Sequence, residues 1–124
     1  MTRRRFFLAA PLLPLAVLAG EPKGKSIRLL SFCAAGVQYH EFAKNPPLAR
    51  SVHLLREPDN RFDANAIALY AQGRKLGYVP KDQNRVLAAL MDGKQPLFAR
   101  IADIAFDAPM WERYRVEVGM ESVG

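Results

Sequence analysis

Short apolar runs broken by turn-forming residues dominate the chain from residue 27 to residue 118. Runs of this length, bounded by Gly, Pro, Asn and Asp, are typical of β-strands joined by tight turns. The Gln72-Gly73-Arg74 connection predicts a hairpin between two of them. Many short strands with hairpin connections favour a small antiparallel β-barrel. We expect strands at residues 27–35, 50–56, 66–71, 75–79, 97–106 and 111–118.

Only one segment has the periodicity of a helix. Val86, Leu87, Leu90 and Met91 recur at the spacing of one helical face, and Gly93 follows as a terminator. Asp82 is the expected capping residue, and residues 36–47 are expected to be a loop. The fold class predicted from the pattern is therefore mainly β, with one or two short helices.

The first twenty residues have a different pattern. Arg3, Arg4 and Arg5 precede an apolar run at residues 6–19, which is shorter than the roughly 20 residues of a membrane-spanning helix. Residues 17–19 have the form of a signal-peptidase site, and residues 2–8 resemble the twin-arginine export motif, with Phe7 in place of the usual leucine.

We therefore predict three segments: an export signal at 1–20, a linker at 21–26 and a domain at 27–120. The predicted location is periplasmic or extracellular, with no stable membrane insertion once the signal has been removed. An uncleaved N-terminal membrane anchor is the alternative.

The net charge and the single cysteine limit which ligands, disulfides and metal sites we expect. The net charge of +6 falls to +3 without the export signal, which permits contact with phosphate but does not require it. Cys33 is the single cysteine, so it forms no intramolecular disulfide, and we expect it to be buried on a strand. With only His40 and His53 beside it, a zinc site lacks ligands. We predict a monomer with no metal, no cofactor and no catalytic residues.

The segment from Arg56 to Val79 carries the candidate chemistry. Phe62 offers a flat face on which a base can stack, and Asp63 accepts hydrogen bonds, which suits a hydroxyl and repels a phosphate. Lys81 is a candidate phosphate contact. Structural roles remain open: Asp63 as a turn cap, Phe62 as a core residue, Trp111 as a core or rim residue, and Tyr78 as a half-buried strand residue.

Three strings resemble the HIRAN family over roughly residues 27–118. They are Gly36-Val37-Gln38-Tyr39, Arg56-Glu57-Pro58-x-Asn60-x-Phe62-Asp63-x-Asn65-Ala66-Ile67, and Gly77-Tyr78-Val79-Pro80. The resemblance implies an OB-like β-barrel. It also implies recognition of a single-stranded DNA 3′ end, as in family members fused to a translocase motor.

By the same resemblance, Phe62 stacks the terminal base, Asp63 reads the free 3′-hydroxyl and Asn60 supports the pocket. Tyr39 and His40 belong to a loop that closes over the end. Two positions depart from the DNA-binding members, which carry arginine where Gln38 stands and tyrosine where His40 stands. The nucleic-acid-binding residues predicted are Gln38, Tyr39, His40, Asn60, Phe62, Asp63, Tyr78 and Lys81.

Two function hypotheses follow. The first is a nucleic-acid-binding module whose partner is a single-stranded end. The alternative is an exported binding or scaffolding domain with another ligand: a glycan, a nucleotide or a protein. The sequence has no phosphate loop and no nucleophile motif, so we do not expect an enzyme.

Overall fold

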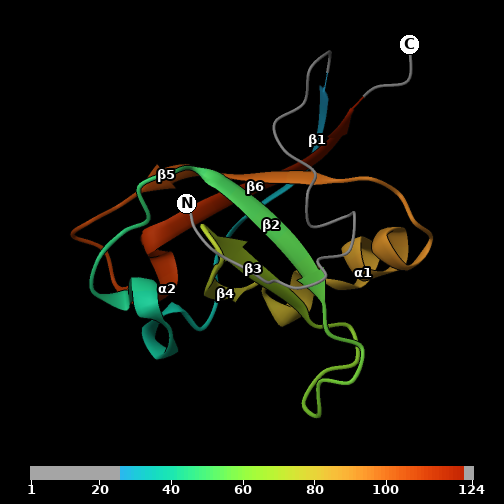
Figure 1. Cartoon of the computed structure of the whole chain (residues 1–124), viewed down its shortest axis with the longest axis horizontal. Helices are drawn as coiled ribbons and strands as arrows, with labels where there is room; N and C mark the ends of the chain where they lie inside the picture. The colour runs from blue at the N-terminus through green and yellow to red at the C-terminus, as the bar shows by residue number, and fades with distance from the viewer. Residues whose placement is uncertain (1–25, 122–124) are drawn as a thin grey trace.

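The computed structural model describes residues 26–121 and shows a mainly β protein with short helices (Figure 1). All six predicted strands are present, with ends that shift by a few residues. Their bounds are β1 (Ser26–Cys33), β2 (Ser51–Arg56), β3 (Ile67–Ala71), β4 (Arg74–Tyr78), β5 (Phe98–Ile104) and β6 (Tyr114–Glu121).

The strands form one antiparallel sheet in the order β1-β6-β5-β2-β3-β4. β1 and β4 stand at its two ends. Just beyond β1, Ala35 pairs with Tyr78 of β4 in an isolated antiparallel bridge of two 2.8 Å backbone hydrogen bonds. The sheet is therefore curled enough for its ends to meet at one point. Closure into an OB-like barrel stays a prediction.

The core fills the concave side of this curled sheet. Alternate residues of β2, Val52 and Leu54, face inward, as expected for a half-buried strand. Tyr114 begins β6 and is also buried, and its hydroxyl donates to the carbonyl oxygen of Phe42 over 2.9 Å. The largest fully buried side chains are Phe32, Val37, Val52, Ile67, Leu69, Leu76, Leu87, Ile101, Tyr114, Val116 and Val118.

Three expectations about the helices and turns were wrong. Helix α1 spans Arg85–Asp92, and Asn84 rather than Asp82 occupies its N-cap position. Asp82 lies instead in the 3₁₀ turn η4 (Lys81–Gln83). The expected loop at 36–47 contains two further 3₁₀ turns, η2 (Val37–Tyr39) and η3 (Glu41–Ala43).

The third correction concerns Trp111. It lies in the short helix α2 (Met110–Arg113) with 64% of its surface exposed, so it is neither in a strand nor in the core. Pro109 precedes α2, and its fixed φ suits the start of a helical turn. Cys33 is likewise half-buried rather than fully buried.

Several predictions fall wholly or partly outside the described residues. The export signal at 1–20 lies there, as does the predicted linker except for Ser26, which is the first residue of β1. Within residues 26–121, no helix has the length and apolar character needed to span a membrane. In the same range, no group of three or more His, Cys, Asp or Glu side chains is arranged to hold a metal ion.

Candidate functional site

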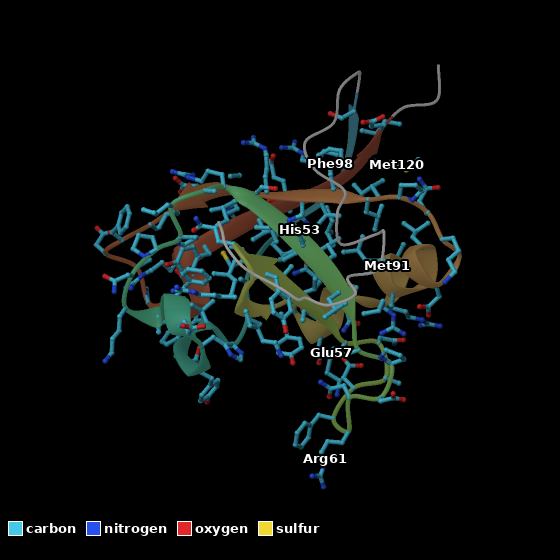
Figure 2. All side chains as sticks on the ribbon, viewed as in Figure 1. His53, Glu57, Arg61, Met91, Phe98 and Met120 are labelled. Carbon is cyan, nitrogen blue, oxygen red and sulfur yellow. The ribbon has the colours of Figure 1, made fainter. Side chains whose placement is uncertain are left out.

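The loop from Glu57 to Ala66 extends away from the sheet and is organised around Asn60 (Figures 1 and 2). The Asn60 side-chain oxygen accepts hydrogen bonds from the backbone N–H groups of Phe62 (2.9 Å) and Asp63 (3.2 Å). Its amide group donates to Glu57 over 3.0 Å. A side chain that is hydrogen-bonded through both its oxygen and its amide group shapes the loop, and its support of a nucleic-acid pocket stays a prediction.

Phe62 is displayed at the tip of this loop. Its side chain is 80% exposed, which excludes the alternative of a core residue. The Arg61 guanidinium lies 5.7 Å from the centre of the Phe62 ring, in the range of a cation–π contact. Figure 2 shows Arg61 pointing outward from the loop. An aromatic face held in solvent is available for stacking.

The carboxylate of Asp63, which follows Phe62 in the chain, is fixed in place. One oxygen accepts from the backbone N–H of Asn65 over 2.9 Å, and the other accepts from the side chain of buried Asn84 over 2.7 Å. These bonds, with Lys81 and Arg56 nearby, hold the pKa of Asp63 below its ordinary value. The group is therefore ionised at neutral pH, and each oxygen keeps a lone pair for another donor.

A bulge in β4 builds the neighbouring part of the site. Tyr70 pairs with Lys75 and Leu69 pairs with Gly77, so Leu76 is an extra residue on β4. Simple alternation would place Lys75 and Tyr78 on opposite faces. The bulge buries Leu76 and Gly77 in succession and leaves Lys75 and Tyr78 half-buried on one face.

Lys75, Tyr78 and Glu57 form a closed hydrogen-bonded triangle. The Tyr78 hydroxyl donates to Glu57 over 2.8 Å, and the Lys75 ammonium donates to both Glu57 (3.2 Å) and the Tyr78 oxygen (2.9 Å). Burial alone would raise the pKa of Glu57, but the bonds from Asn60, Tyr78 and Lys75 lower it overall. Burial raises the pKa of the Tyr78 phenol. The triangle ties β4 to the base of the loop.

His40 lies near the Tyr78 ring of this triangle. The imidazole lies 6.2 Å from the Tyr78 ring, centre to centre, at a tilt of 49°. The pKa of His40 is lowered mainly by burial and, to a smaller extent, by the nearby charge of Lys75. The ring is therefore neutral at pH 7. Gln38 is exposed beside it, and Tyr39 is 79% exposed. Of these three residues, His40 is the one whose ring lies near Tyr78.

Hydrogen bonds and one ring contact thus connect four of the eight predicted residues, directly or through Glu57: His40, Tyr78, Asn60 and Asp63. Phe62 joins them through its backbone bond to Asn60. Lys81 is exposed, and its charge acts on Asp63. Gln38 and Tyr39 stand apart, connected through the chain at His40. The grouping makes a site possible, and the nucleic-acid roles of the eight residues stay predictions.

Sequence reasoning missed Glu57, Lys75 and Asn84. Glu57 lay inside the family string, but nothing in the sequence showed that it would meet Tyr78. Lys75 depends on a bulge that has no sequence signal of its own. Asn84 precedes α1, and its carbonyl oxygen accepts the first helical N–H, that of Ala88. Its side chain is directed at Asp63 instead of capping the helix. The isolated Asn before the helix was its only signal.

Comparison with known proteins identifies the family pattern. Residues 27–119 match the HIRAN domain. A solved protein from Lactobacillus plantarum is 25% identical, with 76% of this chain and 93% of that chain covered and a TM-score of 0.64. The HIRAN domain of human HLTF is 24% identical, with 78% and 79% covered and a TM-score of 0.60, which shows a shared fold. A search of curated proteins finds no match.

Proposed function

This chain belongs to the HIRAN family, and on that premise we propose that it binds single-stranded DNA at a free 3′ end. The end lies between the Glu57–Ala66 loop and the β4 face that carries Tyr78. Phe62 stacks the terminal base, and Asp63 accepts the hydrogen bond of the 3′-hydroxyl. Lys81 neutralises a backbone phosphate.

An ionised Asp63 that directly follows an exposed Phe62 in the chain is the observation that carries this proposal. A carboxylate with a lowered pKa and remaining lone pairs takes a hydroxyl donor and repels a phosphate. A continuing strand or a phosphorylated end would bring negative charge to the same place. The aromatic ring supplies sequence-tolerant binding, since every base has a face to stack.

The charges around the site suit a strand end better than a long continuous backbone. Lys81 is exposed near Asp63, but Lys75 is already paired with Glu57 and Tyr78. Gln38 stands where the DNA-binding relatives carry arginine, so one phosphate contact of the family pattern is missing. Modest affinity with a shallow salt dependence is therefore expected.

Substitution of Asp63 tests the proposal. Fluorescence anisotropy with 5′-labelled oligonucleotides compares a free 3′-hydroxyl with a 3′-phosphate for the natural protein and for Asp63→Asn. We expect the natural protein to prefer the hydroxyl by roughly tenfold, in line with a charged hydrogen bond of about 1.5–3 kcal/mol. In Asp63→Asn the preference should shrink towards equality. Asp103→Asn, an exposed aspartate on β5, is the matched charge control.

The ratio of the two affinities separates recognition from folding. If Asp63 only supported the loop through Asn65 and Asn84, the variant would lose affinity for both ends by the same factor. That result would remove the hydroxyl-reading role. Binding of no oligonucleotide by the natural protein would favour the alternative of another ligand.

A further inference from the structure

His40 carries an imidazole that is held in place but has no hydrogen-bond partner. Its backbone N–H donates to the carbonyl oxygen of Val37 over 3.0 Å, and its carbonyl oxygen accepts from Ala43 over 3.1 Å. The residue therefore joins the turns η2 and η3 in a fixed position. Among residues 26–121, neither ring nitrogen takes part in a hydrogen bond or an ion pair, so both are available to a ligand.

The His40 ring lies at the proposed binding site through contacts between side chains. Its centre is 6.2 Å from the centre of the Tyr78 ring. Tyr78 is in turn joined to the Glu57–Ala66 loop by its 2.8 Å hydrogen bond to Glu57. The proposed function places the strand end between this loop and the β4 face that carries Tyr78. A strand bound there therefore passes close to the His40 ring.

Lys75 and Glu57 are the charged groups that act most strongly on His40. Lys75 already donates to Glu57 and to Tyr78, so its ammonium is not free for a phosphate. Burial and the charge of Lys75 hold the pKa of His40 below its ordinary value of 6.5, and the charge of Glu57 partly opposes them. The ring without a ligand is neutral at pH 7 and gains its proton in mildly acidic solution.

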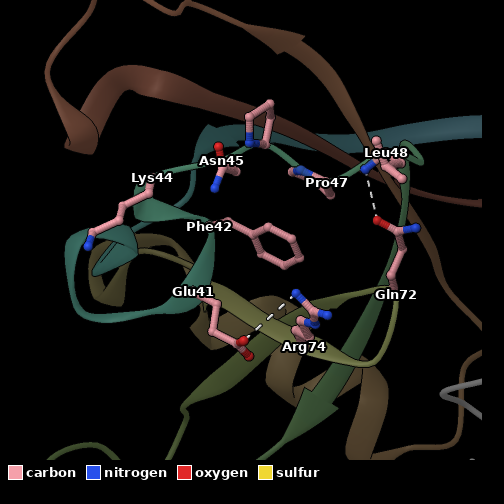
Figure 3. A pocket seen from close by; sticks show the side chains of 9 residues that line it. Glu41, Phe42, Lys44, Asn45, Pro47, Leu48, Gln72 and Arg74 are labelled. Atoms are coloured by element: carbon pink, nitrogen blue, oxygen red, sulfur yellow. Dashed lines mark hydrogen bonds and ion pairs between the residues drawn. The ribbon is translucent and has the colours of Figure 1, made fainter.

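The other charged groups around the turns η2 and η3 have different partners or face solvent. Glu41 lies 3.8 Å from Arg74, and Figure 3 shows these two side chains directed at one another. On α2, which contacts η2, Arg113 donates to a backbone carbonyl oxygen and Glu112 is exposed. Because no acid in the described part of the chain pairs with the His40 ring, a phosphate oxygen would be its first ionic partner.

We propose that the His40 imidazolium binds a phosphate of the strand whose 3′ end lies at Asp63. This inference rests on the proposed function. The phosphate stabilises the charged ring, so binding of the strand and binding of a proton favour each other. Affinity for the strand should therefore rise as the pH falls through the pKa of His40 in the complex. It should level off below the lower pKa of the free protein.

His40 can be isolated because the surrounding groups keep their charge in mildly acidic solution. The pKa values of Glu57 and Asp63 are lowered from 4.5 and 3.8, and those of Lys75 and Tyr78 are raised from 10.5 and 10.0. None of these four groups changes its charge between about pH 5.5 and 7.5. His53, the other histidine of the chain, lies on β2 and provides a matched control.

The test is the affinity of the full chain for a 5′-labelled oligothymidylate with a free 3′-hydroxyl, measured by anisotropy at about pH 5.5 and 7.5. Thymine does not titrate in this range. We expect the natural protein to bind roughly threefold to tenfold more tightly at the lower pH, as for one charged contact. His40→Gln should bind equally at the two pH values. His53→Gln should keep the pH dependence of the natural protein.

The salt dependence gives a second readout that a purely structural role of His40 would not change. For the natural protein, the slope of log affinity against log salt should be steeper at the lower pH by about 0.7, the value for one single-strand phosphate contact. In His40→Gln the two slopes should be equal. His40→Lys places a permanent cation at this position and should show the steeper slope at both pH values.

The two proposals fail in different ways. If the natural protein binds equally at both pH values, or if His40→Gln keeps the pH dependence, His40 holds no phosphate. The preference for a 3′-hydroxyl over a 3′-phosphate, measured at the higher pH, would survive either result. Loss of that preference in the natural protein would instead overturn the proposed function and this inference with it.

Discussion

The residues of the Glu57–Ala66 loop divide into those that build it and those that remain available to a ligand. The Asn60 side chain bonds within the loop, to two backbone N–H groups and to Glu57. Phe62 is free in solvent, and Asp63 is bonded but keeps acceptor capacity. The sequence identified all three, because turn formers beside an aromatic–acid pair carry a local signal. The sequence could not show the role of Glu57, because Lys75 and Tyr78, two of its partners, lie 18 and 21 residues away.

Because of the Glu57 triangle, the free energy of unfolding depends on pH in the acid range. Because the folded-state pKa of Glu57 lies below its ordinary value of 4.5, its stabilising contribution is full above about pH 4.5. It is lost as the pH falls through the lowered value. The pKa values of Asp63 and Asp92 are also lowered, so both carboxylates add to this pH dependence.

We predict that Glu57→Gln lowers the free energy of unfolding at pH 7 by roughly 1–3 kcal/mol, because Lys75 loses its charged acceptor. The difference from the natural protein should narrow below pH 4.5, as measured by urea unfolding across the pH range. Glu112→Gln, at an exposed position on α2, is the control. A difference that stays constant from pH 7 to pH 3 would contradict a role for the ionised carboxylate.

At the scale of elements, the strands were predictable and the details of β4 were not. Apolar runs bounded by turn formers located all six strands, since a half-buried strand leaves a period of two in the sequence. The bulge at Leu76 changes which residues share a face and leaves no such trace. Residues 110–113 form a helical turn after Pro109, although the aromatic and apolar residues around Trp111 favoured a strand.

Two glycines near β4 allow a matched test of how closely the ends of the sheet approach. A Cβ on Gly77 would collide with the carbonyl oxygen of Ala35 and lie 3.3 Å from a methyl group of Val37. A Cβ on Gly73 would meet nothing within 4 Å, but its φ of +78° disfavours alanine. The first position is limited by space and the second by backbone conformation alone.

We therefore predict that Gly77→Ala costs about 2–4 kcal/mol of unfolding free energy and Gly73→Ala about 1 kcal/mol. Urea unfolding measures both values. Gly77→Ala should also weaken DNA binding, because the displaced Ala35 segment leads into the turn that carries Tyr39 and His40. Equal costs at the two positions would mean that the Ala35–Tyr78 bridge contributes little to the fold.

At the scale of the whole molecule, the sheet brings distant segments to one strand. The Glu57–Ala66 loop and the turns η2 and η3 all contact β4, which forms one end of the sheet. Hydrophobic patterning predicted the strands but not their order, since the order depends on pairings between residues far apart in the sequence. The family resemblance implied an OB-like barrel, and the closure of that barrel stays a prediction. Export through the signal at 1–20 stays a prediction, because those residues lie outside the described structure.

Recognition of a strand end is the central claim, and a strand without an end tests it most directly. The measurement is anisotropy competition between a linear oligonucleotide with a free 3′-hydroxyl and the same sequence closed into a circle, repeated across a salt series. We predict that the linear strand competes at least roughly tenfold better, and that the affinity for it falls with salt. Equal competition by the circle would contradict end recognition and leave only general single-strand binding.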